Sequence, residues 1–158
     1  FLPHGNYQKL VVEEMKGKPE SGNIVTEDGE VLGKHNGLFN YTIGQRKGLG
    51  IAYKHPLYVI GFNGDRNEVI VGPNERLFTN RMICKFYNFL DDTIHKELKA
   101  EGKIRYAANP SPCTARILDD DTMEVIFEEP QRAITPGQSV AFYNGTQLLG
   151  GAVIDRVC

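Results

Sequence analysis

Six short apolar runs, separated by turn residues, fill the second half of the chain. They cover residues 82–90, 98–106, 113–118, 123–127, 139–143 and 148–154. Turn chemistry lies between several of them, at 119–121, 135–137 and 144–145. Six short strands at this spacing favour a closed barrel, because closure removes exposed strand edges. We therefore predict a six-stranded antiparallel β-barrel over residues 77–158.

The first half of the chain mixes one helical pattern with hairpin patterns. Apolar residues recur at helical spacing over residues 7–15, which predicts a short helix. Asp28-Gly29 between two apolar pairs predicts a hairpin with a tight turn, and the runs 57–60 and 68–71 predict a second one. We expect a small mixed α/β domain over residues 1–76, so that the chain as a whole is mainly β.

A glycine-rich segment over residues 37–51 is the densest run of unusual residues. Its Thr42-Ile43-Gly44-Gln45 matches a helix capping box, and Gly48 suits a left-handed C-terminal position. A helix of barely more than one turn is expected there. The adjacent cations Arg46 and Lys47 suit phosphates, which makes Gln45, Arg46 and Lys47 candidate interface residues. The alternative is that Gln45 is consumed in the capping box and that the glycines serve packing alone.

Charge is segregated along the chain. The net charge is −2, yet residues 31–64 and 102–118 contain no Asp or Glu and carry +4 and +3. The remainder therefore carries −2 − 7 = −9. Such segregation is typical of a binding face with a repelling opposite side, although acidic residues can also avoid two stretches by chance.

The chain shows no sign of a membrane, disulfide or metal site. It has no apolar run long enough to cross a bilayer and no charged-then-apolar leader. Its three cysteines, Cys84, Cys113 and Cys158, are far apart and form no CxxC pair, and its histidines lack metal-ligand spacing. We expect a reduced, cytoplasmic protein with no membrane partner and no metal bound by this chain.

Several motifs follow one another along the chain. The main one is His35-Asn36-Gly37 followed by Tyr41-Thr42-Ile43-Gly44-Gln45-Arg46-Lys47-Gly48-Leu49-Gly50-Ile51. Others follow at 56–60, 103–106, 127–130, 135–138 and 149–151. In order and spacing, these motifs closely resemble those of the tRNA-specific 2-thiouridylases. The similarity covers essentially the whole chain, and several collinear motifs are more specific than any one of them.

The resemblance implies an architecture and a chemistry. The family has an ATP-pyrophosphatase domain, then a small central domain, then a C-terminal barrel like those of translation factors; this chain looks like the last two. The family enzyme uses ATP with Mg²⁺ to activate the C2 oxygen of the tRNA wobble uridine. It then replaces that oxygen with sulfur from a cysteine persulfide, which a persulfide donor protein or cysteine desulfurase supplies. On this reading the persulfide cysteine immediately precedes Phe1, ATP binds in the first domain, and the chain alone is inactive.

Arg105, Tyr106 and Gln138 are the candidate tRNA-binding residues. An arginine can bind phosphate through two nitrogens, and an adjacent tyrosine can stack on an unpaired base if both lie at a strand end. Gln138 follows a Thr135-Pro136-Gly137 turn and offers both donor and acceptor. The matching family residues contact tRNA. The alternatives are a core tyrosine, a solvated edge arginine and an ordinary surface glutamine.

Two other classes of function compete with a tRNA-modifying sulfurtransferase. One is a non-catalytic RNA-binding or translation-factor-like barrel protein, and the other is a small-molecule-binding barrel. The reading frame upstream of Phe1 separates them, because a cysteine preceded by an ATP-pyrophosphatase domain selects the enzyme and a start codon selects a rival.

Overall fold

The computed structural model describes residues 20–158, and the chain divides into two compact units between Leu77 and Phe78. The regular structure of the described residues consists of strands and two short 3-10 turns, η1 (Leu38–Asn40) and η2 (Asn74–Leu77). The helix predicted over residues 7–15 lies outside them. The described residues are therefore mainly β, as the sequence predicted.

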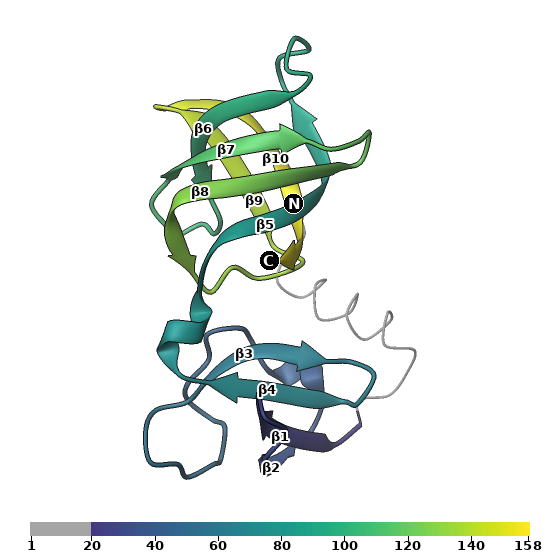
Figure 1. The fold of residues 1–158 in the computed structure, drawn as a ribbon, viewed down its shortest axis with the longest axis vertical. Helices are drawn as coiled ribbons and strands as arrows, with labels where there is room; N and C mark the ends of the chain where they lie inside the picture. Colours follow the sequence, from purple (N-terminus) through teal and green to yellow (C-terminus); the bar gives the residue numbers. More distant parts are fainter. Residues whose placement is uncertain (1–19) are drawn as a thin grey trace. The chain divides into compact units, whose positions relative to one another are not determined.

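The first unit is built on a four-stranded mixed sheet (Figure 1). Its strands are β1 (Gly22–Thr26), β2 (Val31–His35), β3 (Tyr58–Asn63) and β4 (Glu68–Gly72), in the order β2-β1-β4-β3. β1 runs parallel to β4, whereas the β1–β2 and β3–β4 pairs are the two predicted antiparallel hairpins.

Local chemistry explains both the hairpin and the core of this unit. Gly29 adopts a left-handed φ of 88°, and its amide donates to the Thr26 carbonyl over 3.0 Å, which closes the β1–β2 turn. The core residues come from the sheet, from the glycine-rich segment that follows β2, and from the residue directly before β3. They are Ile24, Leu38, Leu49, Leu57, Val59, Val69 and Val71.

The helix predicted after Thr42 is wrong. Residues 42–45 form a turn, in which the Gln45 amide donates to the Thr42 carbonyl over 3.0 Å. Gly44 takes a φ of 90°, which no right-handed helix contains. Its amide donates to the Val59 carbonyl over 2.8 Å, and the Val59 amide donates to the Gln45 carbonyl over 2.9 Å. The segment thus satisfies its backbone by pairing with β3 instead of coiling.

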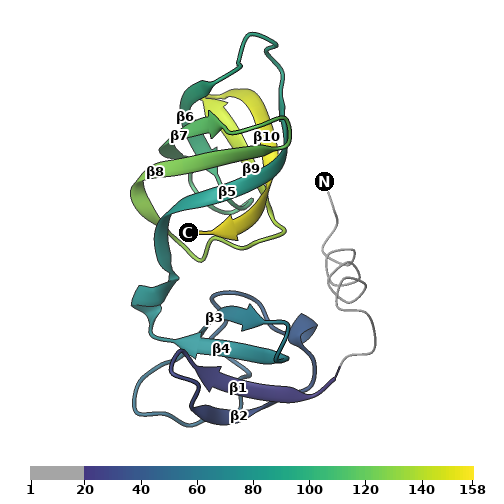
Figure 2. The same ribbon diagram turned by 45° about the vertical axis from the view of Figure 1, so that its right-hand side comes forward.

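The second unit is the predicted six-stranded antiparallel barrel (Figures 1 and 2). The strands close in the order β10-β5-β8-β7-β6-β9, and every pair is antiparallel. Their bounds are β5 (Phe78–Phe89), β6 (Glu97–Lys103), β7 (Ser111–Ile117), β8 (Thr122–Arg132), β9 (Ser139–Asn144) and β10 (Gln147–Val157).

Alternating side chains fill the barrel. Met123, Val125 and Phe127 of β8 are buried, as the two-residue period of a strand requires. Gly102 marks a tight point, because a Cβ there would lie 3.0 Å from the Phe127 ring and 3.1 Å from Cys113 Sγ. The barrel is therefore a packed core with no room for an added side chain at this point of β6.

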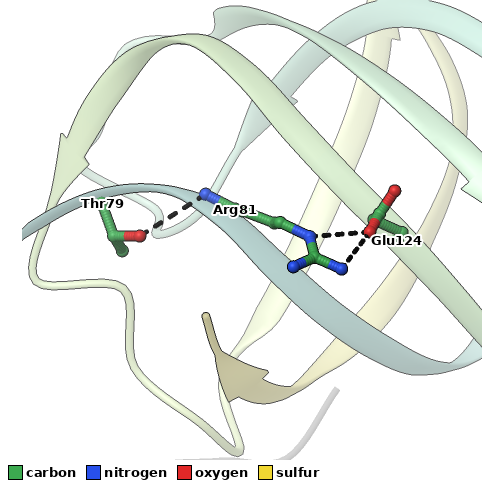
Figure 3. A network of polar contacts seen from close by, with 3 residues as sticks. All are labelled: Thr79, Arg81 and Glu124. Carbon is green, nitrogen blue, oxygen red and sulfur yellow. Dashed lines mark hydrogen bonds and ion pairs between the residues drawn. The ribbon is translucent and has the colours of Figure 1, made fainter.

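The outer surface carries an ion pair between neighbouring strands (Figure 3). Arg81 of β5 donates from Nε to Glu124 Oε2 of β8 over 2.7 Å, and its Nη2 lies 2.5 Å from the same oxygen. The Arg81 amide also donates to Thr79 Oγ1 over 3.5 Å. Half of the Arg81 side chain is exposed, so solvent screens the pair and its contribution to stability is small.

The two ends of the barrel differ in charge. Antiparallel closure places the connections 90–96, 118–121 and 145–146 at one end, which we call the acidic end. They hold five aspartates and one lysine, a formal charge of −5 + 1 = −4. The connections 104–110 and 133–138 lie at the opposite, basic end, where one arginine and no acid give +1.

Candidate nucleic-acid interface

Arg105 and Tyr106 lie in a turn just beyond the end of β6. The predicted strand ran to Tyr106, but β6 ends at Lys103. Ile104 is 5% exposed and belongs to the barrel core, so it anchors the turn. The Ala108 amide donates to the Arg105 carbonyl over 3.1 Å and closes it. A buried residue thus directly precedes the two candidate residues and fixes their backbone at the basic end.

The Arg105 guanidinium folds back onto the connection between β8 and β9. Its Nη2 donates to the backbone carbonyls of Arg132 and Ala133, the latter over 3.0 Å. Partial burial, and then the nearby charge of Arg132, lower the pKa of Arg105, which stays charged at neutral pH because arginine titrates far above it. Both carbonyls bind Nη2, and each parallel pair of N–H groups on a guanidinium includes Nη2. A phosphate can therefore accept one bond from Nε or from Nη1, but not a bidentate pair. Arg105 therefore links two connections through Nη2, while the residue as a whole remains exposed to solvent.

Among the described residues, Tyr106 is the most exposed large apolar or aromatic residue, at 93%. This excludes the alternative that it belongs to the barrel core. Lys103 Nζ lies over the ring, 5.3 Å from its centroid, which is within the range of a cation–π contact. An aromatic ring thus stands in solvent on a fixed backbone, with a positive charge beside it.

Gln138 closes a turn at the same end of the barrel. Its amide donates to the Thr135 carbonyl over 3.2 Å, and its own carbonyl accepts from the Ile154 amide of β10 over 2.8 Å. Thr135 Oγ1 in turn donates to the Ala133 carbonyl, which also accepts from Arg105. This chain of contacts joins Gln138 to Arg105. The three candidates, up to 33 positions apart in the sequence, thus lie in two linked connections at one end of the barrel.

The candidates of the first unit divide into two kinds. The side chain of Gln45 is used within its own loop: Oε1 accepts from the Thr42 amide over 3.0 Å, and Nε2 donates to the Lys47 carbonyl over 2.9 Å. Gln45 therefore reaches back to Thr42 as a capping box requires, although no helix follows. Arg46 and Lys47 are exposed, so the loop presents two cations to solvent.

His35, which the sequence did not single out as a functional residue, holds the start of this glycine-rich loop. It is 1% exposed. Its Nδ1 accepts from the Gly37 amide over 3.0 Å, so Nε2 carries the proton and donates to the Asn67 carbonyl over 2.7 Å. The imidazole thereby fixes the start of the loop to the turn between β3 and β4. The sequence signal was its place directly before Asn36-Gly37 in the family motif.

The described residues offer no reactive thiol inside the barrel. Burial raises the pKa of both Cys84 and Cys113 to about 12, so neither forms a thiolate at neutral pH. Across residues 20–158, no group of three or more His, Cys, Asp or Glu is placed to hold a metal ion. Nor does this part of the chain contain a helix with the length and apolarity needed to cross a membrane.

Sequence comparisons match both units to known domain families. The model of the tRNA methyl transferase PRC-barrel domain matches residues 9–73. The model of the aminomethyltransferase β-barrel domain matches residues 79–154, which includes the whole basic end. Together with the fold, these matches define the chain as a pair of domains, a PRC-barrel-type domain followed by a β-barrel domain.

Individual relatives give the family. The chain is 43% identical over 157 residues to the tRNA-specific 2-thiouridylase MnmA of Clostridioides difficile, and 44% identical over 158 residues to MnmA 1 of Clostridium tetani. Each alignment covers 99% of this chain and 44% of the relative. MnmA of Geotalea uraniireducens is 44% identical over 156 residues. The chain belongs to the tRNA-specific 2-thiouridylase family and carries its central and C-terminal domains. It spans less than half the length of these relatives.

Proposed function

We propose that this chain is the tRNA-holding part of an enzyme that replaces the C2 oxygen of the wobble uridine of tRNA by sulfur. The relatives contain a further region that this chain does not span. In this proposal, that region binds ATP with Mg²⁺ and carries the catalytic cysteines. The sulfur reaches it as a persulfide from a donor protein or a cysteine desulfurase. The complete protein works in the cytoplasm, and the 158-residue chain alone is inactive.

The observation that carries this proposal is the convergence of Arg105, Tyr106 and Gln138 at the basic end of the barrel. A guanidinium, an exposed ring and an amide at one end of the barrel match the three kinds of group that RNA offers: phosphates, base faces and hydrogen-bonding edges. Relatives named as tRNA-specific 2-thiouridylases share 42–44% identity with the chain over alignments of 157 or 158 residues, which include this region. A barrel that binds a small molecule in its interior would not need these three groups at one end of its outer surface.

Each residue takes a separate part in holding the tRNA. Arg105 donates a single hydrogen bond to a phosphate, from Nε or from Nη1, while Nη2 keeps its two backbone contacts. Tyr106 stacks on an unpaired base. Gln138, whose backbone is fixed by β10, bonds a base edge or a ribose hydroxyl. Arg46 and Lys47 add phosphate contacts, or contact the catalytic region, from the first unit.

Two assays test this proposal. The purified chain should bind unmodified tRNA weakly and with a salt dependence, because its net charge is −2 and its basic surface is small. With ATP, Mg²⁺ and a persulfide donor, it should transfer no sulfur to tRNA. Salt-independent tight binding would contradict the small basic surface, and thiolation by the chain alone would overturn the assignment of the chemistry to another region. Absence of any binding to tRNA, for the chain and for the full-length protein, would overturn the function itself.

A further inference from the structure

The ring of Tyr106 has two unlike faces. One of them lies under Lys103 Nζ, at 5.3 Å from the centroid. Among the described residues no other aromatic ring contacts it, and 93% of the residue is exposed. The ring therefore has space for one planar partner on the face away from the ammonium group.

The backbone that carries this ring is held on both sides. Ile104 is buried in the barrel core, Arg105 is bonded to the Arg132 and Ala133 carbonyls, and the Ala108 amide closes the turn. Lys103 is the last residue of β6 and pairs with Ala141 of β9. A ligand that stacks on Tyr106 thus meets a ring whose backbone is already fixed, which lowers the entropy lost on binding.

Charge around the ring selects the ligand. Lys103 is not among the cations that form the ion pairs of the described residues. Its ammonium group is therefore available for the contact with the Tyr106 ring. A cation on one face draws π-electron density toward itself, and the opposite face then favours an electron-rich partner. Purines are more electron-rich and present a larger face than pyrimidines, so they stack more strongly on such a surface.

We propose that Lys103 and Tyr106 form a one-sided platform for a single unpaired purine nucleotide. The base stacks on the open face of Tyr106, and Lys103 is a positioning residue that holds the ring and binds the phosphate of the same strand. This inference rests on the proposed tRNA function and adds to it a further residue and a class of base.

The chain contains no tryptophan, which allows a direct test. Tyr106→Trp places a single fluorescent reporter on the platform. Phe86→Trp is the matched control, because Phe86 is also an exposed aromatic, at 70%, but lies near the acidic end beside Asp121. Each variant is titrated with unmodified tRNA and with hexamers of adenylate or uridylate. Binding of the same tRNA is measured independently by electrophoretic mobility shift.

Quenching of the tryptophan emission of Tyr106→Trp by tRNA is the expected result, and the adenylate hexamer should quench it at lower concentration than the uridylate hexamer. The emission of Phe86→Trp should stay unaffected. Adding Lys103→Met to Tyr106→Trp should weaken the adenylate titration by about 2–5-fold, the scale of an exposed cation–π contact, while Lys103→Arg restores it. A melting curve of each variant establishes that the fold is retained.

Several outcomes would overturn the platform. Equal quenching by both hexamers removes the purine preference. A titration that Lys103→Met leaves unchanged removes the role of Lys103. Tight tRNA binding by Tyr106→Trp with unchanged tryptophan emission shows that no base stacks there, and it leaves the proposed function intact. Loss of all tRNA binding from the chain that retains Tyr106, and from the full-length protein, contradicts the proposed function instead.

Discussion

Two exposed aromatic residues near opposite ends of the same barrel show how surroundings decide what a ring can bind. Tyr106 lies at the basic end with Lys103 over its ring. Phe86 lies near the acidic end, where its amide donates to the Asp121 carbonyl over 3.0 Å. Exposure alone would make both of them candidates for base stacking. Phosphates are attracted to the first end and repelled from the second, so only Tyr106 suits a nucleic acid.

The backbone at the two rings also differs. Phe86 has a φ of 53°, a left-handed conformation at a bulge of β5. On β10, Val153 pairs with Lys85 and Gly151 pairs with Asn88, so two residues of β5 face one residue of β10. The bulge turns an apolar side chain outward within a strand whose neighbours are paired. Tyr106 stands in a turn that Arg105 fastens to the next connection. The Phe86 ring is thus exposed by a bulge in a strand. The Tyr106 ring is exposed by a turn that the Arg105 side chain bonds to two backbone carbonyls.

The largest expected effect comes from Arg105→Ala, because it removes both the proposed phosphate contact and the bonds to the Arg132 and Ala133 carbonyls. Losing about 1–3 kcal/mol of charged hydrogen bonding weakens tRNA binding by roughly 5–150-fold. Loss of the two bonds to backbone carbonyls, about 1–2 kcal/mol of stability, lowers the melting temperature of the barrel by roughly 5–15 °C. Calorimetry and filter binding on the same variant separate these effects.

Lys96→Ala is the matched control for Arg105→Ala. It removes one positive charge from the acidic end, where Lys96 is exposed and its backbone carbonyl accepts from the Ile117 amide over 2.8 Å, a bond that alanine retains. Its tRNA affinity and melting temperature should stay within error of the parent chain. Equal losses in both variants would mean that overall charge, and not the basic end, governs binding.

The second prediction compares the two rings directly. Tyr106→Leu should weaken tRNA binding by roughly 5–150-fold, since stacking on one base is worth about 1–3 kcal/mol. Phe86→Leu should change it less than about twofold, because no phosphate approaches the acidic end. Tyr106→Phe keeps the ring and should resemble the parent chain. If Phe86→Leu costs as much affinity as Tyr106→Leu in filter binding, the contrast between the two ends fails.

Salt dependence gives a third, smaller test. Each phosphate contact contributes ~0.7–0.9 to the slope of log affinity against log salt concentration. Lys103→Met and Arg105→Ala should each lower that slope by about this amount, whereas Lys96→Ala should leave it unchanged. Titrations over a series of salt concentrations measure it. An unchanged slope in all three variants would place the phosphate contacts elsewhere on the chain.

The sequence predicted the barrel because strand alternation and turn residues, the features that define it, can each be recognised within a few neighbouring residues. The alternation of Met123, Val125 and Phe127 and the turn at Asn144-Gly145 can be read over a few residues, and the structure confirmed the six strands. The end of β6 was misplaced because Ile104 continues the apolar pattern of the strand while it already turns into the core. Periodicity cannot distinguish these two kinds of burial.

Long-range pairing explains what the sequence missed. The capping-box pattern at Thr42 predicted a helix, but Gly44 and Gln45 pair with Val59, which is 14 or 15 positions away. Likewise, Arg105 was identified as a candidate, but its bonds to carbonyls 27 and 28 positions away could not be inferred. The resemblance to a family supplied the identity of the candidates, and the structure supplied their contacts.

The smallest expected effect extends the comparison to the glycine-rich loop of the first unit. Gln45→Ala removes two hydrogen bonds within the loop and should cost about 1 kcal/mol of stability, the net value of exposed bonds of this kind. The double variant Arg46→Ala/Lys47→Ala removes two exposed charges and should leave stability unchanged while it lowers the salt slope by up to ~2 if both bind phosphate. Chemical denaturation and tRNA titration measure the two quantities. Gln45 would be a contact residue, contrary to its bonding here, if its variant lost tRNA affinity at unchanged stability. A double variant with the parent slope would assign Arg46 and Lys47 to a protein interface instead of tRNA.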